Sequence, residues 1–309
     1  MTPIFAEDAI RAAAIQWVRG VTMDTMLSIT REQLAGDFAV GGVRFPLIDR
    51  GRGIRKPAGW GAALSITTAA PSSGGARPYD DAEGPDGMHR YKLRRDANGR
   101  SENHSLRVAM DRNVPLIWFY GLVPGEFQVI LPVYLVAEEA DQDQFVLAVT
   151  ADQRSMIEQR TVIPGSPVES TLRRYLIGET RRRLHQPVFA SQVMIAYATA
   201  CAVCALAHRE LLDAAHIIPD SAPGGDPVVP NGLARCKIHH AAYDANVLGI
   251  RPDYTVEIHQ RLLDEIDGPM LRHGLQEHHG RTLMRVPSRR VDRPDGDRLE
   301  RRYADFRAA

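Results

Sequence analysis

The sequence predicts an α+β protein of two domains, and three observations support this fold class. A chain of 309 residues is longer than one hydrophobic core usually needs. The first half is rich in short β-branched and aromatic runs separated by Gly, Pro and Asp, as in an antiparallel sheet. In the second half, one short strand pattern and a loop lie between a Cys-Cys pair and a Cys-His pair, and a helical pattern begins at the second pair.

These patterns divide the chain into three parts. Residues 1–155 are expected to form a twisted, mainly antiparallel, barrel-like sheet with helices. Residues 156–186 read as a basic helical linker, and residues 187–309 as a second domain that ends in a helix. In the first part the expected strands are ALSITTA (63–69), HRYKLRR (89–95), VPLIWFYGL (114–122) and FQVILPVYLVA (127–137), and the expected helix is NHSLRVAMDR (103–112).

The composition is that of an ordinary globular protein, with 44% hydrophobic and 25% charged residues. The longest apolar runs, such as Val129–Ala137, fall far short of the roughly 20 residues that span a bilayer. The N-terminal segment carries early acids and reads as an amphipathic helix, not a cleavable signal, so a cytoplasmic protein without a membrane segment is expected. The zero net charge argues against a wholly basic nucleic-acid wrapper, while clusters of Arg suit either phosphate contacts or solvated helix faces.

The three cysteines have the spacing of a metal site. Cys201 and Cys204 form a C-x-x-C pair, and Cys236 and His239 form a C-x-x-H pair. Two such half-sites complete a Cys3His shell for a structural zinc ion, because each pair can bend around one tetrahedral ion. A redox C-x-x-C would leave Cys236 unexplained.

A second set of residues is interleaved with these ligands. His216 lies in the strand pattern LLDAAHII, Asn231 follows a loop rich in Pro, Gly and Asp, and His240 lies in the helical pattern CKIHHAAYDANVL. Residues 183–290 therefore resemble the zinc-containing HNH endonucleases of the ββα-metal superfamily, in which zinc half-sites and His, Asn and His occur in this order.

The resemblance implies a metal-dependent cleavage of phosphodiester bonds. A neutral imidazole can deprotonate water near neutral pH, so His216 is the expected general base. His240 is the expected ligand of a divalent ion that stabilises the phosphate, and Asp244, one helical turn later, is a second ligand. Asn231 is expected to hold the loop and to orient His216.

One position departs from the family pattern. Many members carry an acid or a second histidine immediately before the general base, where this chain has Ala215. Asp213 is either its substitute as a metal ligand or a surface carboxylate. A sparse shell completed by water suits Mg²⁺ or Mn²⁺.

Residues 42–149 resemble an SRA domain, which reads modified cytosine by flipping the base out of the duplex. The resemblance rests on LSITTAAPSSGGARPYDD, on RYKLRR and on NHSL at the start of the expected helix, with Ser105 where the family usually has Ala. It implies that Tyr79 and Tyr91 stack on the base and that Asp81 or Asp80 accepts a hydrogen bond from its amino group. Alternatively, the tyrosines are ordinary strand residues and the aspartates form turns.

Together the two resemblances indicate a modification-dependent restriction endonuclease acting on double-stranded DNA that contains 5-methylcytosine or 5-hydroxymethylcytosine. A homodimer is expected, because one HNH site cuts one strand at a time. Two other functions stay open: an HNH nuclease that reads phosphorothioate or unmodified sequence, and a non-catalytic binder of modified DNA in which the HNH fold is only a zinc scaffold.

Overall fold

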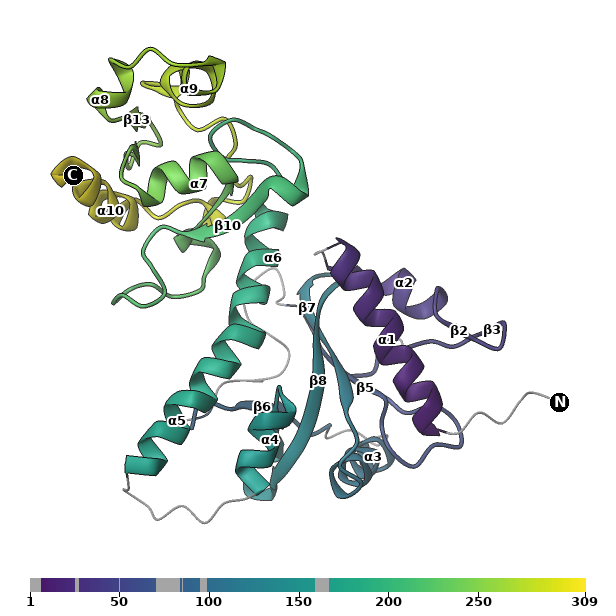
Figure 1. Ribbon diagram of the computed structural model, residues 1–309. Helices are drawn as coiled ribbons and strands as arrows, with labels where there is room; N and C mark the ends of the chain where they lie inside the picture. Colours follow the sequence, from purple (N-terminus) through teal and green to yellow (C-terminus); the bar gives the residue numbers. More distant parts are fainter. Residues whose placement is uncertain are drawn as a thin grey trace. The chain divides into compact units, whose positions relative to one another are not determined.

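The structure is a computed structural model. It describes residues 7–25, 28–49, 51–70, 84, 86–94, 99–158 and 167–309. The chain divides into two compact units, Met1–Val188 and Phe189–Ala309, and the division falls inside helix α6 (Gln186–Ala196) (Figure 1). Within the described residues no helix is both long enough and apolar enough to cross a membrane.

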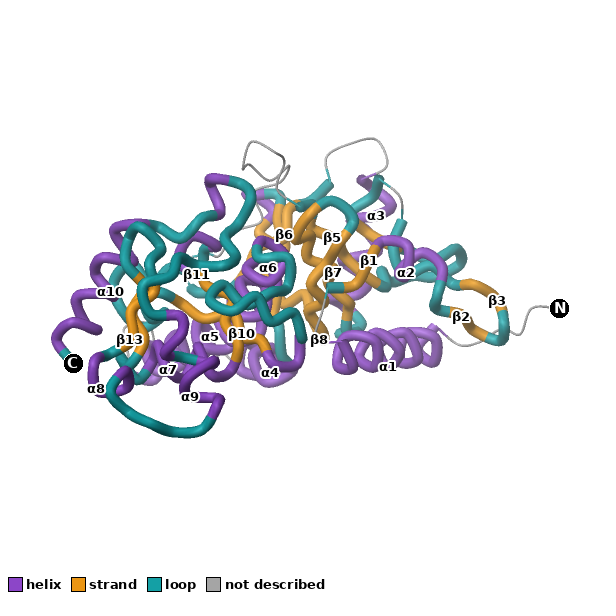
Figure 2. Tube along the Cα trace, turned by 90° about the horizontal axis from the view of Figure 1, so that it is seen from above, coloured by secondary structure: helices purple, strands orange, loops and turns teal. Residues whose placement is uncertain are grey.

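A curved, half-barrel sheet forms the centre of the first unit (Figures 1 and 2). In spatial order its strands are β4 (Ile54–Arg55), β5 (Ser65–Thr68), β7 (Leu116–Val123), β8 (Glu126–Glu139), β9 (Gln144–Ala148) and β6 (His89–Lys92), and β1 (Ile29–Thr30) pairs with the start of β8. All neighbours are antiparallel except β5 and β7. A separate hairpin joins β2 (Ala39–Val40) to β3 (Val43–Arg44). The α+β class and the four expected strands are confirmed.

The curvature has local causes. Strand β8 pairs with β7 over its first half and with β9 over its second half, and both pairings contain register shifts. Such bulges bend a strand and increase its twist. At one of them, near Gly121, a Cβ atom would lie 2.4 Å from the backbone nitrogen of Ala70, so only glycine permits this approach. Across the sheet, Tyr91 on the edge strand β6 donates a hydrogen bond to Gly53 O (2.8 Å) beside the other edge strand, β4.

Helices cover the sheet. They are α1 (Glu7–Thr25), α2 (Arg31–Gly36), α3 (Gly99–Asp111), α4 (Ala151–Glu158) and α5 (Pro167–Thr180). Figure 2 shows α1 running alongside the strands, where Ala14 and Val18 share a core with Ile117 and Phe119 of β7. Helix α3 begins four residues before Asn103, so the NHSL element lies inside the helix and does not open it. There the Asn103 side chain pairs with the backbone N and O of Arg94.

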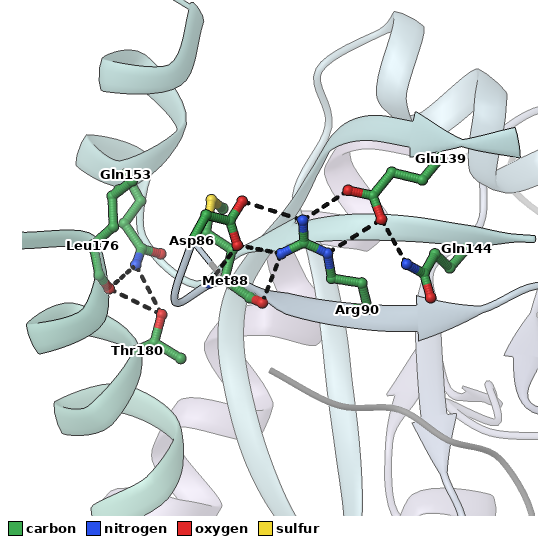
Figure 3. Close-up of polar contacts among 8 residues, drawn as sticks. All are labelled: Asp86, Met88, Arg90, Glu139, Gln144, Gln153, Leu176 and Thr180. Carbon is green, nitrogen blue, oxygen red and sulfur yellow. Dashed lines mark hydrogen bonds and ion pairs between the residues drawn. The ribbon is translucent and has the colours of Figure 1, made fainter. Parts of the chain in front are cut away.

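Buried polar groups hold the strands and helices at one side of this sheet, as Figure 3 shows. Arg90, which is 8% exposed, lies between Asp86 and Glu139, and its Nη2 is 2.7 Å from Glu139 Oε1. Gln153 of α4 accepts a hydrogen bond from the backbone N of Val149 and donates one to Leu176 O of α5. These contacts connect the end of β9 with both helices.

The second unit is built around a hairpin and a helix. Its elements are β10 (Leu212–His216), β11 (Gly232–Cys236), α7 (Lys237–Asp244), β12 (Leu248–Ile250), β13 (Val256–Ile258), α8 (Gln260–Leu263), α9 (Pro269–Gly274) and α10 (Gly296–Ala308). Helix α10 begins at the N-cap Asp295 and lies against β12, where a Cβ on Gly249 would meet the Phe306 ring at 2.6 Å. The segment before this unit is helical, as expected: α5 continues through a π-helical turn, Arg181–His185, into α6.

Candidate functional site

The hairpin and α7 position most of the expected site residues. Strands β10 and β11 pair so that His216 lies opposite Gly232 and Leu212 lies opposite Cys236. Helix α7 begins directly after Cys236, its N-cap. The end of the hairpin therefore carries one ligand pair at the start of the helix, while His216 lies at the opposite end of the same ladder.

Cys201, Cys204, Cys236 and His239 come together as one cluster, with their donor atoms within 4.8 Å of one another. His239 Nδ1 lies 3.0 Å from Cys236 Sγ and 3.5 Å from Cys201 Sγ. The C-x-x-C turn is closed by a hydrogen bond from Ala205 N to Cys201 O (2.9 Å). Three sulfurs and one imidazole nitrogen around a common centre are the donor set of a structural zinc site.

The thiols of the cluster share their hydrogen bonds unequally. Hydrogen bonds from Cys204 and Cys236 lower the pKa of the Cys201 thiol, and contacts with Cys201 and Cys236 raise the pKa of the Cys204 thiol, so the cluster stabilises one thiolate at Cys201. His278 lies edge-on to His239, with ring centroids 5.1 Å apart. Nothing in the sequence motif points to His278, because it comes from the short 3-10 turn Gln276–His278 far along the chain.

His216 is half-buried at the end of β10. Its ring stacks on Phe189 at 4.1 Å between centroids, and its Nε2 is buried without a hydrogen-bond partner among the described residues. Burial lowers the pKa of His216, and the negative charge of Asp220 only partly opposes this shift. The ring is therefore neutral near pH 7, the form that a general base requires.

Asn231 is fully buried and fully engaged by its own loop. Its Nδ2 donates to Ile218 O and Asp226 O, both at 3.0 Å, and its Oδ1 accepts from Ile218 N at 2.9 Å. Its backbone O also accepts a hydrogen bond from Ile217 N. Asn231 thus fixes the chain immediately after His216.

His240 lies between two carboxylates. Its Nδ1 is 3.0 Å from Asp213 Oδ2, and its Nε2 is 3.3 Å from Asp244 Oδ2. Asp213 also pairs with Lys237. Partial burial opposes ionisation of Asp213, but the hydrogen bonds from His240 and Lys237 outweigh it and lower the pKa of this carboxyl.

The two acids therefore occupy opposite edges of one ring. Asp213 and Asp244 do not converge with His240 on a common point; in the described part of the chain the Cys3His set is the only group of three or more such donors that does so. Asp213 was one candidate to replace the metal-binding acid that is missing at Ala215. Its carboxylate lies beside Nδ1 of the His240 ring, whereas Asp244 lies beside Nε2.

A cavity of about 490 Å³ joins these side chains. It is lined by Ala215, His216, Ile217, Pro219, Asp220, His240, Asp244, Asn246, Arg302 and Asp305. His216, His240 and Asp244 thus line one cavity. Asp220, Arg302 and Asp305 were not anticipated, and the last two could not be, because they lie on α10, outside the local pattern.

The first unit has its own cavity, of about 390 Å³. Its lining residues are Arg31, Gly51, Arg52, Gly53, Ile54, Thr67, Ala69, Ala70, Tyr91, Lys92, Arg94, Val123, Pro124, Gly125 and Phe127. The walls are largely apolar, and Arg31, Arg52, Lys92 and Arg94 supply positive charge. A volume of this size is typical of small-ligand sites.

Tyr91 is the expected pocket residue that the structure describes. Its ring lines this cavity, and its hydroxyl is bound to Gly53 O. Tyr79, Asp80 and Asp81 lie outside the described residues. Phe127, whose ring lies 5.3 Å from the Arg31 guanidinium, is a second aromatic wall that the sequence pattern did not single out.

Comparison with known proteins identifies one domain. Residues 201–251 match the HNH endonuclease family, and this range contains the Cys3His set together with His216, Asn231 and His240. No curated protein matches the chain. A solved structure of the modification-dependent TagI restriction endonuclease is similar with a TM-score of 0.30 and 15% sequence identity, covering 90% of this chain and 92% of that chain. At this TM-score the two folds are not shown to be the same.

Proposed function

We propose that the chain is a modification-dependent restriction endonuclease. It carries an HNH endonuclease domain at residues 201–251, which makes it a DNA endonuclease. In this proposal the second unit hydrolyses phosphodiester bonds of double-stranded DNA. The first unit, an SRA-like domain, binds a flipped 5-methylcytosine or 5-hydroxymethylcytosine. The observation that carries the nuclease half is the convergence of His216, His240 and Asp244 on one cavity.

His216 acts as the general base. Its pKa is lowered by burial, so the ring is neutral near pH 7 and can accept a proton from water. Stacking on Phe189 fixes the plane of the ring. Asn231 holds the following residues and thereby keeps the imidazole in place.

The donor atoms at the Nε2 edge of His240 fit a divalent ion. An imidazole nitrogen and a carboxylate oxygen of Asp244 lie 3.3 Å apart at the cavity, and such mixed donors with open positions suit Mg²⁺ or Mn²⁺. A bound ion would stabilise the negative charge that develops on the phosphate. Asp213, on the other edge, orients the ring by accepting from Nδ1.

A zinc ion held by Cys201, Cys204, Cys236 and His239 has a different role. A bound ion would tie the C-x-x-C turn to the junction of β11 and α7. Because His240 lies at the start of α7, the ion would stabilise the scaffold of the site without taking part in the chemistry.

The proposal for the first unit is supported by its cavity. Apolar walls with Tyr91 and Phe127 can cover the faces of a base, and the surrounding cations can contact phosphate without reading sequence. We place Tyr79 and one of Asp80 and Asp81 at this pocket by resemblance alone.

A plasmid cleavage assay tests the function. Plasmids that carry 5-methylcytosine, 5-hydroxymethylcytosine, phosphorothioate or no modification are incubated with the protein, Mg²⁺ or Mn²⁺, and with a His216→Ala variant as the control. Cleavage of the modified-cytosine plasmids alone, lost in the variant, is the expected result. Cleavage of phosphorothioate or unmodified DNA would instead identify a different reader, and binding to modified DNA without any cleavage would refute the nuclease role.

We also propose that the active form is a homodimer, since a double-strand break needs two sites or two successive nicks. Sedimentation on cognate DNA tests this proposal. A complex of one chain per duplex would contradict it.

A further inference from the structure

We propose that Arg302, on the C-terminal helix α10, contacts the scissile phosphate and is a catalytic residue of the nuclease. Arg302 lines the same cavity as His216 and His240. It lies well outside residues 201–251, the range that matches the HNH family. The inference rests on the proposed function to the extent that this cavity is the cutting site.

The guanidinium of Arg302 is held in place. It lies over the Tyr243 ring, 4.6 Å from the centroid, while its Nη1 donates to Asn246 Oδ1 and its Nη2 to Tyr243 O. A guanidinium has five N–H groups, and these two contacts leave others available on a side chain that lines the cavity. A fixed planar fork with free donors is well suited to bind phosphate oxygens.

The negative charges around the cavity require a positively charged group if a phosphate is to bind there. Asp220, Asp244 and Asp305 line the cavity, and a phosphodiester adds another negative charge. Carboxylates alone would repel the substrate. Among the lining residues Arg302 is the one Arg or Lys, so together with a divalent ion it can balance the three carboxylates before DNA binds.

Arg302 also has contacts that could serve only to attach α10 to the end of α7. The same helix offers a comparison for that role. Arg298 donates to Gly224 O at 3.3 Å and Arg301 donates to Pro223 O at 2.6 Å, and both tie α10 to a loop without lining the cavity. Arg301→Ala is therefore a matched control that removes an arginine from the same helix.

The test compares Arg302→Ala, Arg302→Lys and the control Arg301→Ala with the unaltered chain. Turnover and KM are measured on a fluorescent DNA duplex with Mn²⁺, together with the melting temperature and zinc content of each variant. We expect Arg302→Ala to lower kcat about 100-fold, the loss typical of one fixed donor to a developing anion. Arg302→Lys should recover part of kcat, and millimolar guanidinium should partly restore Arg302→Ala.

Arg301→Ala should keep kcat within about threefold of the unaltered chain, since it retains the guanidinium of Arg302. The inference is overturned if Arg302→Ala keeps kcat within the same range. It is also overturned if guanidinium has no effect on a variant that remains folded. The His216→Ala variant distinguishes failure of the proposed nuclease site from failure of the Arg302 inference. Full activity of His216→Ala would contradict the proposed site. Loss of activity in His216→Ala together with normal activity in Arg302→Ala would contradict only the role of Arg302.

Discussion

The adjacent histidines offer the sharpest test of the site, because one is buried in the Cys3His cluster and the other faces the cavity. His239 is 2% exposed and lies 3.0 Å from Cys236 Sγ, whereas the His240 side chain is 29% exposed and lies between two carboxylates. His239→Ala should therefore remove zinc and stability, and His240→Ala should remove activity alone.

The expected magnitudes differ several-fold. Structural zinc sites contribute roughly 10–16 kcal/mol, and a variant that no longer binds zinc loses most of that contribution. For a unit of this size that loss corresponds to a fall in melting temperature of more than about 10 °C. His240→Ala breaks two partly exposed ion pairs, each worth about 0–1 kcal/mol, and should lower the melting temperature by at most a few degrees.

Three measurements on each variant decide between the outcomes: zinc per chain by metal analysis, thermal unfolding, and plasmid cleavage. The unaltered chain should contain about one zinc ion. His240→Ala should keep that zinc and lose cleavage, while His239→Ala should lose both. Equal zinc content and equal melting in the two variants would refute the division of roles.

Four further predictions each concern one side chain. Since burial lowers the pKa of His216, kcat should rise with pH along a limb centred below the usual histidine value of about 6.5 and then stay level; a limb centred above that value would contradict the assignment. Asp213→Ala should weaken Mn²⁺ binding, measured by titration calorimetry, by about 10–100-fold. Asp213→Asn should weaken it less, because the amide oxygen can still accept a hydrogen bond from the His240 ring. If both variants lost as much Mn²⁺ affinity as a variant that lacks a metal ligand, Asp213 would have to bind the ion directly. Arg90→Met should destabilise the first unit by about 1–3 kcal/mol in urea unfolding, because it removes the partner of two carboxylates that remain about one-third exposed to solvent, with unchanged zinc content as the control. Tyr79→Ala should weaken binding of methylated duplex by about 1–3 kcal/mol and leave unmethylated duplex unaffected at the same salt concentration, whereas Tyr91→Phe, which keeps the ring, should cost mainly stability; equal losses on both duplexes for Tyr79→Ala would remove the tyrosine from the pocket.

The parts of the site that depend on short spacing could be predicted from the sequence. The C-x-x-C and C-x-x-H pairs fix which side chains can reach one ion, and the order of His216, Asn231 and His240 follows a strand, a loop and a helix. The β-branched runs of the first half likewise predicted the strands, because each strand needs only a local pattern. The structure bears out the clustering of the Cys3His residues and the positions of these strands, since both are set by local spacing.

Features set by tertiary contacts were beyond such reading. The edge of the His240 ring that Asp213 occupies depends on the register of β10 against β11 and on the start of α7. Arg302 lines the cavity from α10, a helix that packs closely against β12 at Gly249, and no local sequence pattern predicts this packing. The start of α3 before Asn103 depends on tertiary context and not on the NHSL pattern alone.

The same geometry explains why two histidines stand side by side. Successive residues on a helix point about 100° apart, so at the start of α7 one ring can turn to the thiolates while the next turns to the cavity. His239 uses Nδ1 toward Cys236, and His240 has Nδ1 occupied by Asp213, which leaves Nε2 beside Asp244. In the proposed mechanism the zinc therefore sets the position of the helix to which the second histidine belongs, and the hairpin register sets its separation from His216. A change that moved the zinc ligands by one residue would turn His240 away from the cavity even if every catalytic side chain were retained.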